Sequence, residues 1–172
     1  MTPKRPVRGR SHSPGSHIPT REHGVVRKQW RGRLRVALVS PNAYGAGMAN
    51  LGFQTVYRLL NDLPGVLCER FFYNPKQEPP LVSMESGRSL RRFDIVAFSV
   101  SFENDYLNLL FVLQKAGIPL RAAQREAPHP LVMAGGVACF LNPEPLAAFI
   151  DCFLLGEAEQ MLPAFMAHFD PH

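Results

Sequence analysis

From Arg33 onward, short apolar runs alternate with segments of helical periodicity. This alternation is typical of a parallel sheet whose strands are joined by helices. The first run, RVALVS, is almost continuously apolar and branched, which indicates a strand that is buried on both faces. The apolar runs predict five strands, over residues 35–40, 68–73, 93–101, 129–136 and 151–156.

Helical spacing and end signals predict the connections between these strands. After the first strand, Asn50 is in the position of a helix N-cap, and the apolar residues that follow it share one helix face. A second helix is predicted over 104–116, because Gly117 can adopt the left-handed conformation that ends a helix.

Two further helices are predicted in the last third of the chain. A short helix should lie near the NPEP turn, between the fourth and fifth strands. A final helix should begin after Gly156. We expect Pro163 in its first turn or at a break, since an interior proline loses a backbone hydrogen bond.

The order of these elements predicts an α/β fold. We expect a flavodoxin-like (Rossmann-like) three-layer sandwich with a five-stranded parallel sheet of order 2-1-3-4-5. The chain has 172 residues and 46% hydrophobic composition, enough for one domain with a proper core. Ligands of such sheets bind in the crevice at the carboxyl ends of the strands, here strands one and three.

The net charge of +5 belongs to one end of the chain. Residues 1–35 hold ten of the nineteen Lys and Arg and one acid, so the remainder carries nine bases and thirteen acids. We therefore expect a basic, flexible lead-in over residues 1–32, followed by a folded domain over 33–169. The lead-in has no interleaved aromatic residues, which favours a solvated linker over a nucleic-acid partner.

Targeting and cysteine patterns narrow the class of protein further. No apolar stretch approaches the roughly 20 residues needed to span a bilayer, and no signal-peptide core is visible. We expect a soluble cytoplasmic protein with no membrane partner. Cys68, Cys139 and Cys152 are widely spaced and lie in apolar runs, which predicts buried free thiols rather than disulfides or a metal site.

Polar and glycine residues gather where the predicted strands end. Because these ends share one edge of the sheet, the residues predict a single cofactor-binding crevice, with no catalytic residue and no metal ligand. The candidates are Ser40, Asn42, Tyr44, Gly45 and Gly47 after the first strand, Ser99 and Ser101 after the third, Gly135 and Gly136 after the fourth, and Gly156 and Glu157 after the fifth.

Several ligand classes lack their motifs. Asn50 stands where a dinucleotide fingerprint needs its third glycine after Gly45 and Gly47, and no Gly-Lys-Ser/Thr loop exists. A receiver domain would need acids after the first strand and a lysine after the fifth, where this chain has Ser40 and Gly156. No histidine stands beside a candidate nucleophile, so hydrolase chemistry has no visible residues.

Three segments together resemble the N-terminal cobalamin-binding-like domain of a subset of radical S-adenosylmethionine (SAM) proteins. The likeness covers about residues 22–168 in the family's order, including AGIPLRAAQR and a closing Gly-Glu-x-Glu. The segments are LRVALVSPNAYGAGMANLGFQTVYRLLN, MESGRSLRRFDIVAFSVSFENDYLNLLFVLQKAGIPLRAAQR and PLVMAGGVACFLNPEPLAAFIDCFLLGEAEQMLPAF.

The first loop departs from the usual cobalamin-binding pattern. That pattern, Asp-x-His-x-x-Gly, supplies a histidine as the lower cobalt ligand, whereas this loop reads SPNAYGAG. The Ser-x-Ser after the third strand and the glycine pair after the fourth do match the family's cofactor-lining positions. The resemblance therefore implies either a cobalamin held without a protein lower ligand, or a crevice that serves as a substrate-side or interdomain scaffold.

The iron-sulfur motif of radical SAM enzymes is also missing. Their barrel carries Cys-x-x-x-Cys-x-x-Cys, which holds a 4Fe-4S cluster, whereas the three cysteines here are 71 and 13 positions apart. Residues 170–172 lie where a barrel would be expected to begin. The resemblance implies that SAM and the cluster belong to an absent or separate radical SAM catalytic domain, which is the expected partner.

Three functions stay open at this point. The first is a cobalamin-binding-like accessory domain, non-catalytic on its own, that contributes a cofactor or substrate crevice to a radical SAM protein. The second is a free-standing flavodoxin-like binder of a nucleotide or flavin phosphate, which would use the helix N-termini after Asn50 and Asn104 as anion sites. The third is a structural domain whose apolar helix faces dock a neighbour.

Overall fold

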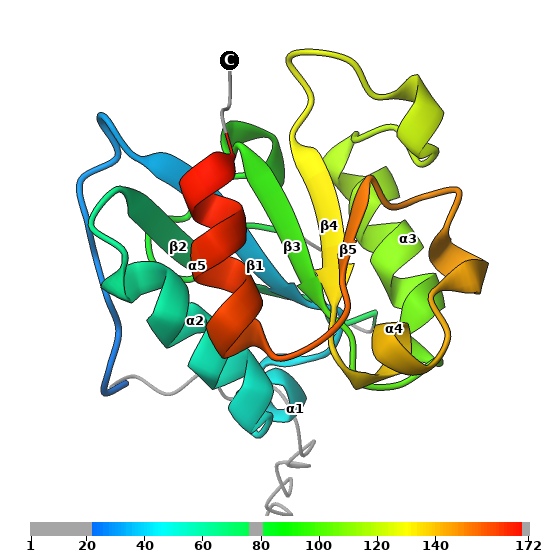
Figure 1. Cartoon of the computed structure of the whole chain (residues 1–172), viewed down its shortest axis with the longest axis horizontal. Helices are drawn as coiled ribbons and strands as arrows, with labels where there is room; N and C mark the ends of the chain where they lie inside the picture. The colour runs from blue at the N-terminus through cyan, green and yellow to red at the C-terminus, as the bar shows by residue number, and fades with distance from the viewer. Residues whose placement is uncertain (1–21, 76–80, 170–172) are drawn as a thin grey trace, which may run out of the picture.

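A five-stranded parallel sheet of order β2-β1-β3-β4-β5 lies at the centre of the molecule (Figure 1). The computed structural model describes residues 22–75 and 81–169. The predicted fold class and strand order are confirmed. The strands are β1 (Leu34–Ser40), β2 (Val66–Phe72), β3 (Ile95–Ser99), β4 (Leu131–Gly135) and β5 (Cys152–Leu154).

Helices cover both faces of this sheet and enclose two apolar cores (Figure 1). α2 and α5 pack on one face, where Phe53 and Leu162 meet Val36 and Leu38 of β1. α3 and α4 pack on the other face, against alternate residues of the same strands. The helices are α1 (Tyr44–Met48), α2 (Leu51–Asp62), α3 (Asp105–Ala116), α4 (Val137–Leu141) and α5 (Ala158–His168), with 3₁₀ turns at Leu90–Arg92, Ala122–Gln124 and Glu144–Leu146.

Local signals fixed two helix ends as predicted. Asn50 caps α2, with its Oδ1 accepting a hydrogen bond from the Phe53 backbone N–H at 3.0 Å. Gly117 ends α3 in the left-handed region at φ 66°. The short helix after the fourth strand begins earlier than the NPEP turn, directly after Gly136, and a 3₁₀ turn occupies Glu144–Leu146.

The prediction for Pro163 was wrong. α5 begins at Ala158 and continues past Pro163 to His168, so the proline lies inside the helix. Leu162 and Met166 on either side of it are buried in the core shared with α2 and the sheet. Burial of these side chains outweighs the one backbone hydrogen bond that a proline removes.

The segment that enters β1 is anchored along α2 and β2. The Val26 backbone N–H donates to the Tyr57 hydroxyl at 2.9 Å, and Lys28 Nζ donates to the carbonyl oxygens of Leu63 (3.1 Å) and Val66 (2.8 Å). A cation at the end of α2 is favoured by the helix dipole. Residues 1–21 of the predicted lead-in, and residues 170–172, lie outside the described residues, and the boundary at residue 33 stays a prediction.

Side chains close the outer edge of β2. Asn61 bonds both backbone groups of Cys68, donating from Nδ2 to its carbonyl at 3.0 Å and accepting at Oδ1 from its N–H at 3.2 Å. The Arg70 N–H donates to Glu85 Oε2 at 2.7 Å, and the Met84 N–H donates to the Arg70 carbonyl at 2.9 Å. These contacts occupy backbone groups that would otherwise pair with another strand.

The Arg70 side chain joins three parts of the chain in a buried ionic network. It is 3% exposed, and it donates to Glu85 Oε1 at 2.6 Å and to Glu22 Oε2 at 3.0 Å. Its guanidinium lies over the Tyr57 ring, 4.7 Å from the centroid. The hydrogen bonds from Arg70 lower the pKa of Glu22. Every buried side-chain nitrogen and oxygen among the described residues has a hydrogen-bond partner.

None of the helices in the described ranges is long and apolar enough to cross a membrane.

Arg70→Met should lower the free energy of unfolding by about 3–5 kcal/mol, because it leaves the buried carboxylate of Glu85 and the partly buried carboxylate of Glu22 without their cation. Urea unfolding measures this loss. The matched control is Arg58→Met on α2, where the ion pair with Asp62 is 3.7 Å long and the Arg58 side chain is 84% exposed. The control should change stability by no more than about 0.5 kcal/mol. Similar losses in the two variants would contradict the structural role given to Arg70.

Candidate functional site

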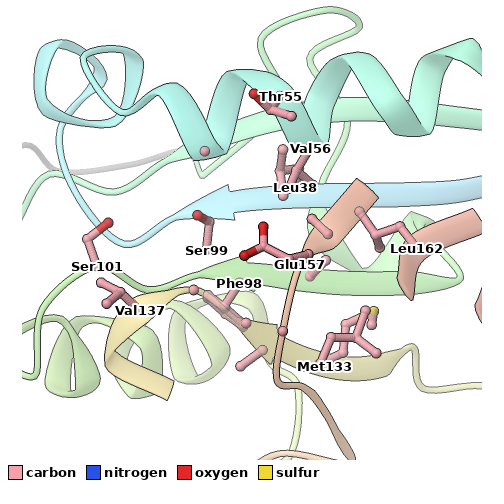
Figure 2. A pocket seen from close by; sticks show the side chains of 18 of the residues that line it. Leu38, Thr55, Val56, Phe98, Ser99, Ser101, Met133, Val137, Glu157 and Leu162 are labelled. Atoms are coloured by element: carbon pink, nitrogen blue, oxygen red, sulfur yellow. The ribbon is translucent and has the colours of Figure 1, made fainter. Parts of the chain in front are cut away.

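A pocket of about 360 Å³ opens at the carboxyl ends of β3, β4 and β5, between the sheet and helices α2 and α5 (Figure 2). Its volume lies near the lower end of the range of small-molecule sites. The walls are mostly apolar: Leu38 from β1, Val56 from α2, Ala97 from β3, Met133 from β4 and Leu162 from α5. Such a lining suits a flat apolar group.

A small set of polar side chains surrounds the same space. Figure 2 shows Ser99 and Glu157 near its centre, between Leu38 and Val56 on one side and Met133 on the other. A hydroxyl can donate or accept a hydrogen bond, whereas an ionised carboxylate only accepts. The pocket therefore offers a few polar side chains beside apolar walls.

Asn50 connects two walls of the pocket. Its Nδ2 donates to Ser101 Oγ at 2.6 Å, while its Oδ1 caps α2 at Phe53. One side chain thus sets the start of α2 relative to the loop after β3. Ser101 keeps its hydroxyl hydrogen available, because its oxygen acts as the acceptor in this contact.

The glycine pair after β4 is required by packing. Gly136 has φ 104°, and a Cβ on it would lie 2.4 Å from the Val100 carbonyl oxygen. A Cβ on Gly135 would lie 3.1 Å from the carbonyl oxygen of Leu154. The close approach of these backbones brings the ends of β3, β4 and β5 together at the mouth of the pocket.

Six of the eleven residues predicted for the crevice line this pocket. They are Ser99, Ser101, Gly135, Gly136, Gly156 and Glu157. The structure brings them together from three strand ends, as the topology predicts. Their role in binding a cofactor stays a prediction.

The five candidates of the first loop do not line the pocket; they are Ser40, Asn42, Tyr44, Gly45 and Gly47. A short helix, α1, forms there in place of an open binding loop. Gly47 is buried, and a Cβ on it would lie 2.6 Å from the Phe72 ring and from Ser40 Oγ. Asn42 Nδ2 donates to buried Asp105 at 2.9 Å, and the Tyr44 ring packs edge-on against Phe72. These contacts give the loop a structural role.

Sequence reasoning missed the wall that α2 and α5 provide. From α2 and its cap come Asn50, Gly52, Thr55 and Val56, and from α5 come Ala158, Glu159 and Leu162. The Asn50 cap was the sequence signal for the part of this wall that α2 provides. Residues about one helical turn after Asn50 face the same strand end as Asn50 does. The contribution of α5 depends on how the last helix packs, which no local pattern encodes.

Glu157 and Glu159 are the His, Cys, Asp or Glu side chains that line the pocket. In the described ranges, no group of three His, Cys, Asp or Glu side chains could hold a metal ion. Neither the described histidines nor the three cysteines line the pocket. Cys68 and Cys139 are free and buried, as predicted, while Cys152 is half-buried. Burial raises the pKa of Cys139 to about 11, so this thiol stays protonated at neutral pH.

Large apolar side chains are exposed along the same edge of the sheet. Leu51 is 77% exposed at the start of α2, and Phe102 is 67% exposed in the loop after β3. Val137, Phe140 and Leu141 of α4 are also exposed. We call these five residues the apolar rim. Clusters of exposed apolar side chains commonly mark an interaction surface.

The fold is that of an α/β domain with a pocket at its strand ends, and comparison with known proteins gives the family. A family model described as "Radical SAM proteins, N-terminal" matches residues 52–171. The chain therefore belongs to this family of radical SAM N-terminal domains. The radical SAM part of the sequence resemblance is confirmed, whereas its cobalamin-binding part stays a prediction.

A curated relative also matches most of the chain. An uncharacterized protein of Methanocaldococcus jannaschii is 25% identical to it over 124 residues, which make up 72% of this chain and 24% of the relative. The chain thus spans about a quarter of the length of that relative. No solved structure gave a significant match.

Gly136→Ala should destabilise the domain by at least about 1–2 kcal/mol, because an L-residue is strained at this positive φ and its methyl group meets the Val100 carbonyl. Gly45→Ala in α1 is the matched control, since nothing lies within 4 Å of its added Cβ. The control should be stabilised by about 0.4–1 kcal/mol. Thermal unfolding compares the two. Equal stabilities would show that a glycine at position 136 is not needed for the pocket backbone.

Proposed function

We propose that this chain is an accessory domain of a radical SAM protein, non-catalytic on its own, and that its strand-end pocket holds part of a cobalamin. The observation that carries the proposal is the mostly apolar pocket, with serine hydroxyls from the end of β3, in a chain of the radical SAM N-terminal family. SAM and the 4Fe-4S cluster would belong to a separate or fused barrel.

The lining suits the nucleotide arm of cobalamin. That arm carries a flat aromatic base on a ribose phosphate, and Leu38, Val56 and Met133 offer apolar walls for such a base. The hydroxyls of Ser99 and Ser101 can donate to ribose or phosphate oxygens, and Glu157 can accept from a ribose hydroxyl. A volume of about 360 Å³ suits one arm rather than the whole cofactor.

The proposal assigns no protein ligand to cobalt. None of the described histidines lines the pocket, and the first loop has Asn42 and Tyr44 where the usual pattern places its histidine region. Cobalamin, when bound, supplies a cobalt centre that can carry an alkyl group. The residues of this chain would bind and orient the cofactor and exclude water from its base.

The alternative of a nucleotide or flavin phosphate depends on two helix N-termini, and both are poorly suited to an anion. At α2, the Asn50 side chain already accepts from the Phe53 N–H. At α3, the first turn carries the carboxylate of Asp105, which is buried and would repel a phosphate. These contacts favour the cobalamin proposal.

The apolar rim supports a protein neighbour at the mouth of the same pocket. Val137 lines the pocket, Leu51 lies between the pocket residues Asn50 and Gly52 in the sequence, and Leu141 is 70% exposed on α4. Leaving these side chains in water is unfavourable, so a partner that covers them would gain from their burial. We assign the rim to the radical SAM catalytic barrel, fused or separate, which would bring its chemistry next to the pocket.

Titration of the full chain with hydroxocobalamin, followed by its visible absorbance, tests the cofactor. Thr55→Phe should weaken binding at least tenfold, because the new ring would fill the pocket wall on α2. Arg58→Phe adds the same bulk to an exposed position of the same helix and should bind as the unaltered chain does. No spectral change with the unaltered chain, or equal affinity in the two variants, would reject the cofactor; a yellow, flavin-containing protein would favour the alternative.

Co-purification tests the barrel. The barrel would be identified by its Cys-x-x-x-Cys-x-x-Cys motif, encoded after His172 or in a neighbouring gene. It would then be expressed together with this chain. The double substitution Phe140→Ser and Leu141→Ser should abolish its capture, whereas Phe111→Ser, which alters a partly exposed side chain of α3, should not. Absence of such a barrel, or capture unaffected by the rim substitutions, would contradict the assignment.

A further inference from the structure

A second, larger hollow lies at the amino-terminal ends of β1, β3 and β4, opposite the candidate pocket. This groove has a volume of about 1420 Å³, above the range of ordinary small-molecule sites. Six arginines and three acids line it, so its formal charge is +3. The arginines are Arg31, Arg33, Arg35, Arg91, Arg92 and Arg125, and the acids are Asp94, Glu126 and Asp151.

The topology of the sheet gathers these arginines from three separate segments. Arg31 and Arg33 lie on the segment that enters β1, and Arg35 is the second residue of that strand. Arg91 and Arg92 lie on the 3₁₀ turn before β3, and Arg125 follows the 3₁₀ turn before β4. β1 and β3 are neighbouring strands, paired in parallel. Their amino-terminal ends therefore present two arginine clusters side by side, although the clusters are more than fifty positions apart in the sequence.

Two of the arginines are fixed in structural ion pairs. Arg35 Nε donates to Asp94 Oδ2 at 2.8 Å, and Arg125 Nη2 donates to Asp151 Oδ1 at 2.8 Å. Arg125 also donates to the carbonyl oxygens of Pro119 and Phe149. These contacts occupy two of the three acids of the groove. Among the described residues, Glu126 is therefore the one acid of the groove left to offset the charge of the remaining arginines.

A third arginine, Arg33, donates to the carbonyl oxygens of Gln29 and Pro64. The other three guanidinium groups face the solvent. Arg31, Arg91 and Arg92 are exposed, and among the described residues their side chains make no hydrogen bond or ion pair. Like charges gathered in one groove repel each other, and an anion relieves that repulsion. The planar fork of arginine matches a phosphate group and binds it through paired hydrogen bonds.

We propose that this groove binds the phosphodiester backbone of a nucleic-acid strand. Its volume and its several cations suit a polymer with repeated phosphates, and it is lined by arginine with no lysine. The groove would contact the nucleic-acid backbone rather than the bases. A base could stack on an exposed Trp30 ring, but Arg88 covers this ring, 4.2 Å from its centroid. The prediction against a nucleic-acid partner was based on the N-terminal lead-in. The groove, in contrast, forms where separate segments of the folded domain come together.

Fluorescence anisotropy of a labelled single-stranded RNA with the full chain, over a series of salt concentrations, tests the proposal. Each arginine that neutralises a phosphate contributes about 0.7 to the slope of log affinity against log salt. The double substitution Arg91→Gln and Arg92→Gln should therefore reduce the slope by about 1.4. Arg58→Gln on α2 removes an exposed arginine outside the groove and should leave the slope unchanged.

The remaining outcomes decide against the groove. RNA binding that is equal in the double variant and the Arg58 control would place the interaction elsewhere, and no RNA binding by the unaltered chain would also reject the proposal. Polyglutamate that binds as tightly as RNA, with the same loss in the double variant, would indicate an acidic protein partner instead. Thermal unfolding checks that the variant is folded, and Arg31→Gln, expected to reduce the slope by about 0.7, provides an independent substitution.

Discussion

The position of the edge strand β2 depends on the buried guanidinium group of Arg70. This group binds Glu22 from the entering segment and Glu85 from the loop after β2, and it stacks on Tyr57 of α2. Four parts of the chain therefore meet at one cation. An ion pair shielded from water is costly to form unless every partner is present. The network makes the position of β2, and of α2 above it, conditional on the N-terminal segment and the following loop.

The carboxyl-terminal and amino-terminal ends of the parallel strands carry side chains of opposite chemical character. At the carboxyl edge, Leu38, Val56 and Met133 enclose an apolar space and exposed apolar side chains surround it. At the amino edge, arginines predominate. Parallel strands make this separation possible, because each strand contributes its beginning to one site and its end to the other. A ligand at one edge would lie at the far end of the same strands from a ligand at the other.

The fold could be predicted from the sequence because its signals are local. Apolar runs gave the five strands, the Asn50 cap gave the start of α2, and Gly117 gave the end of α3. Six of the eleven residues predicted from the strand ends line the pocket. The errors came from tertiary packing: α1 formed where a loop was expected, and α5 continued through Pro163 because Leu162 and Met166 are buried. The arginine groove left no sequence motif, since its members come from separate segments.

The closed outer edge of β2 limits how copies of this protein can aggregate. Asn61, Met84 and Glu85 occupy the outward backbone groups of Cys68 and Arg70, so no neighbouring strand can bond there. The opposite edge strand, β5, is three residues long and offers few backbone groups. Strand-by-strand polymerisation needs a long unpaired edge as a template. The folded domain lacks such a template in its described residues, so amyloid-like growth would require the sheet to open first.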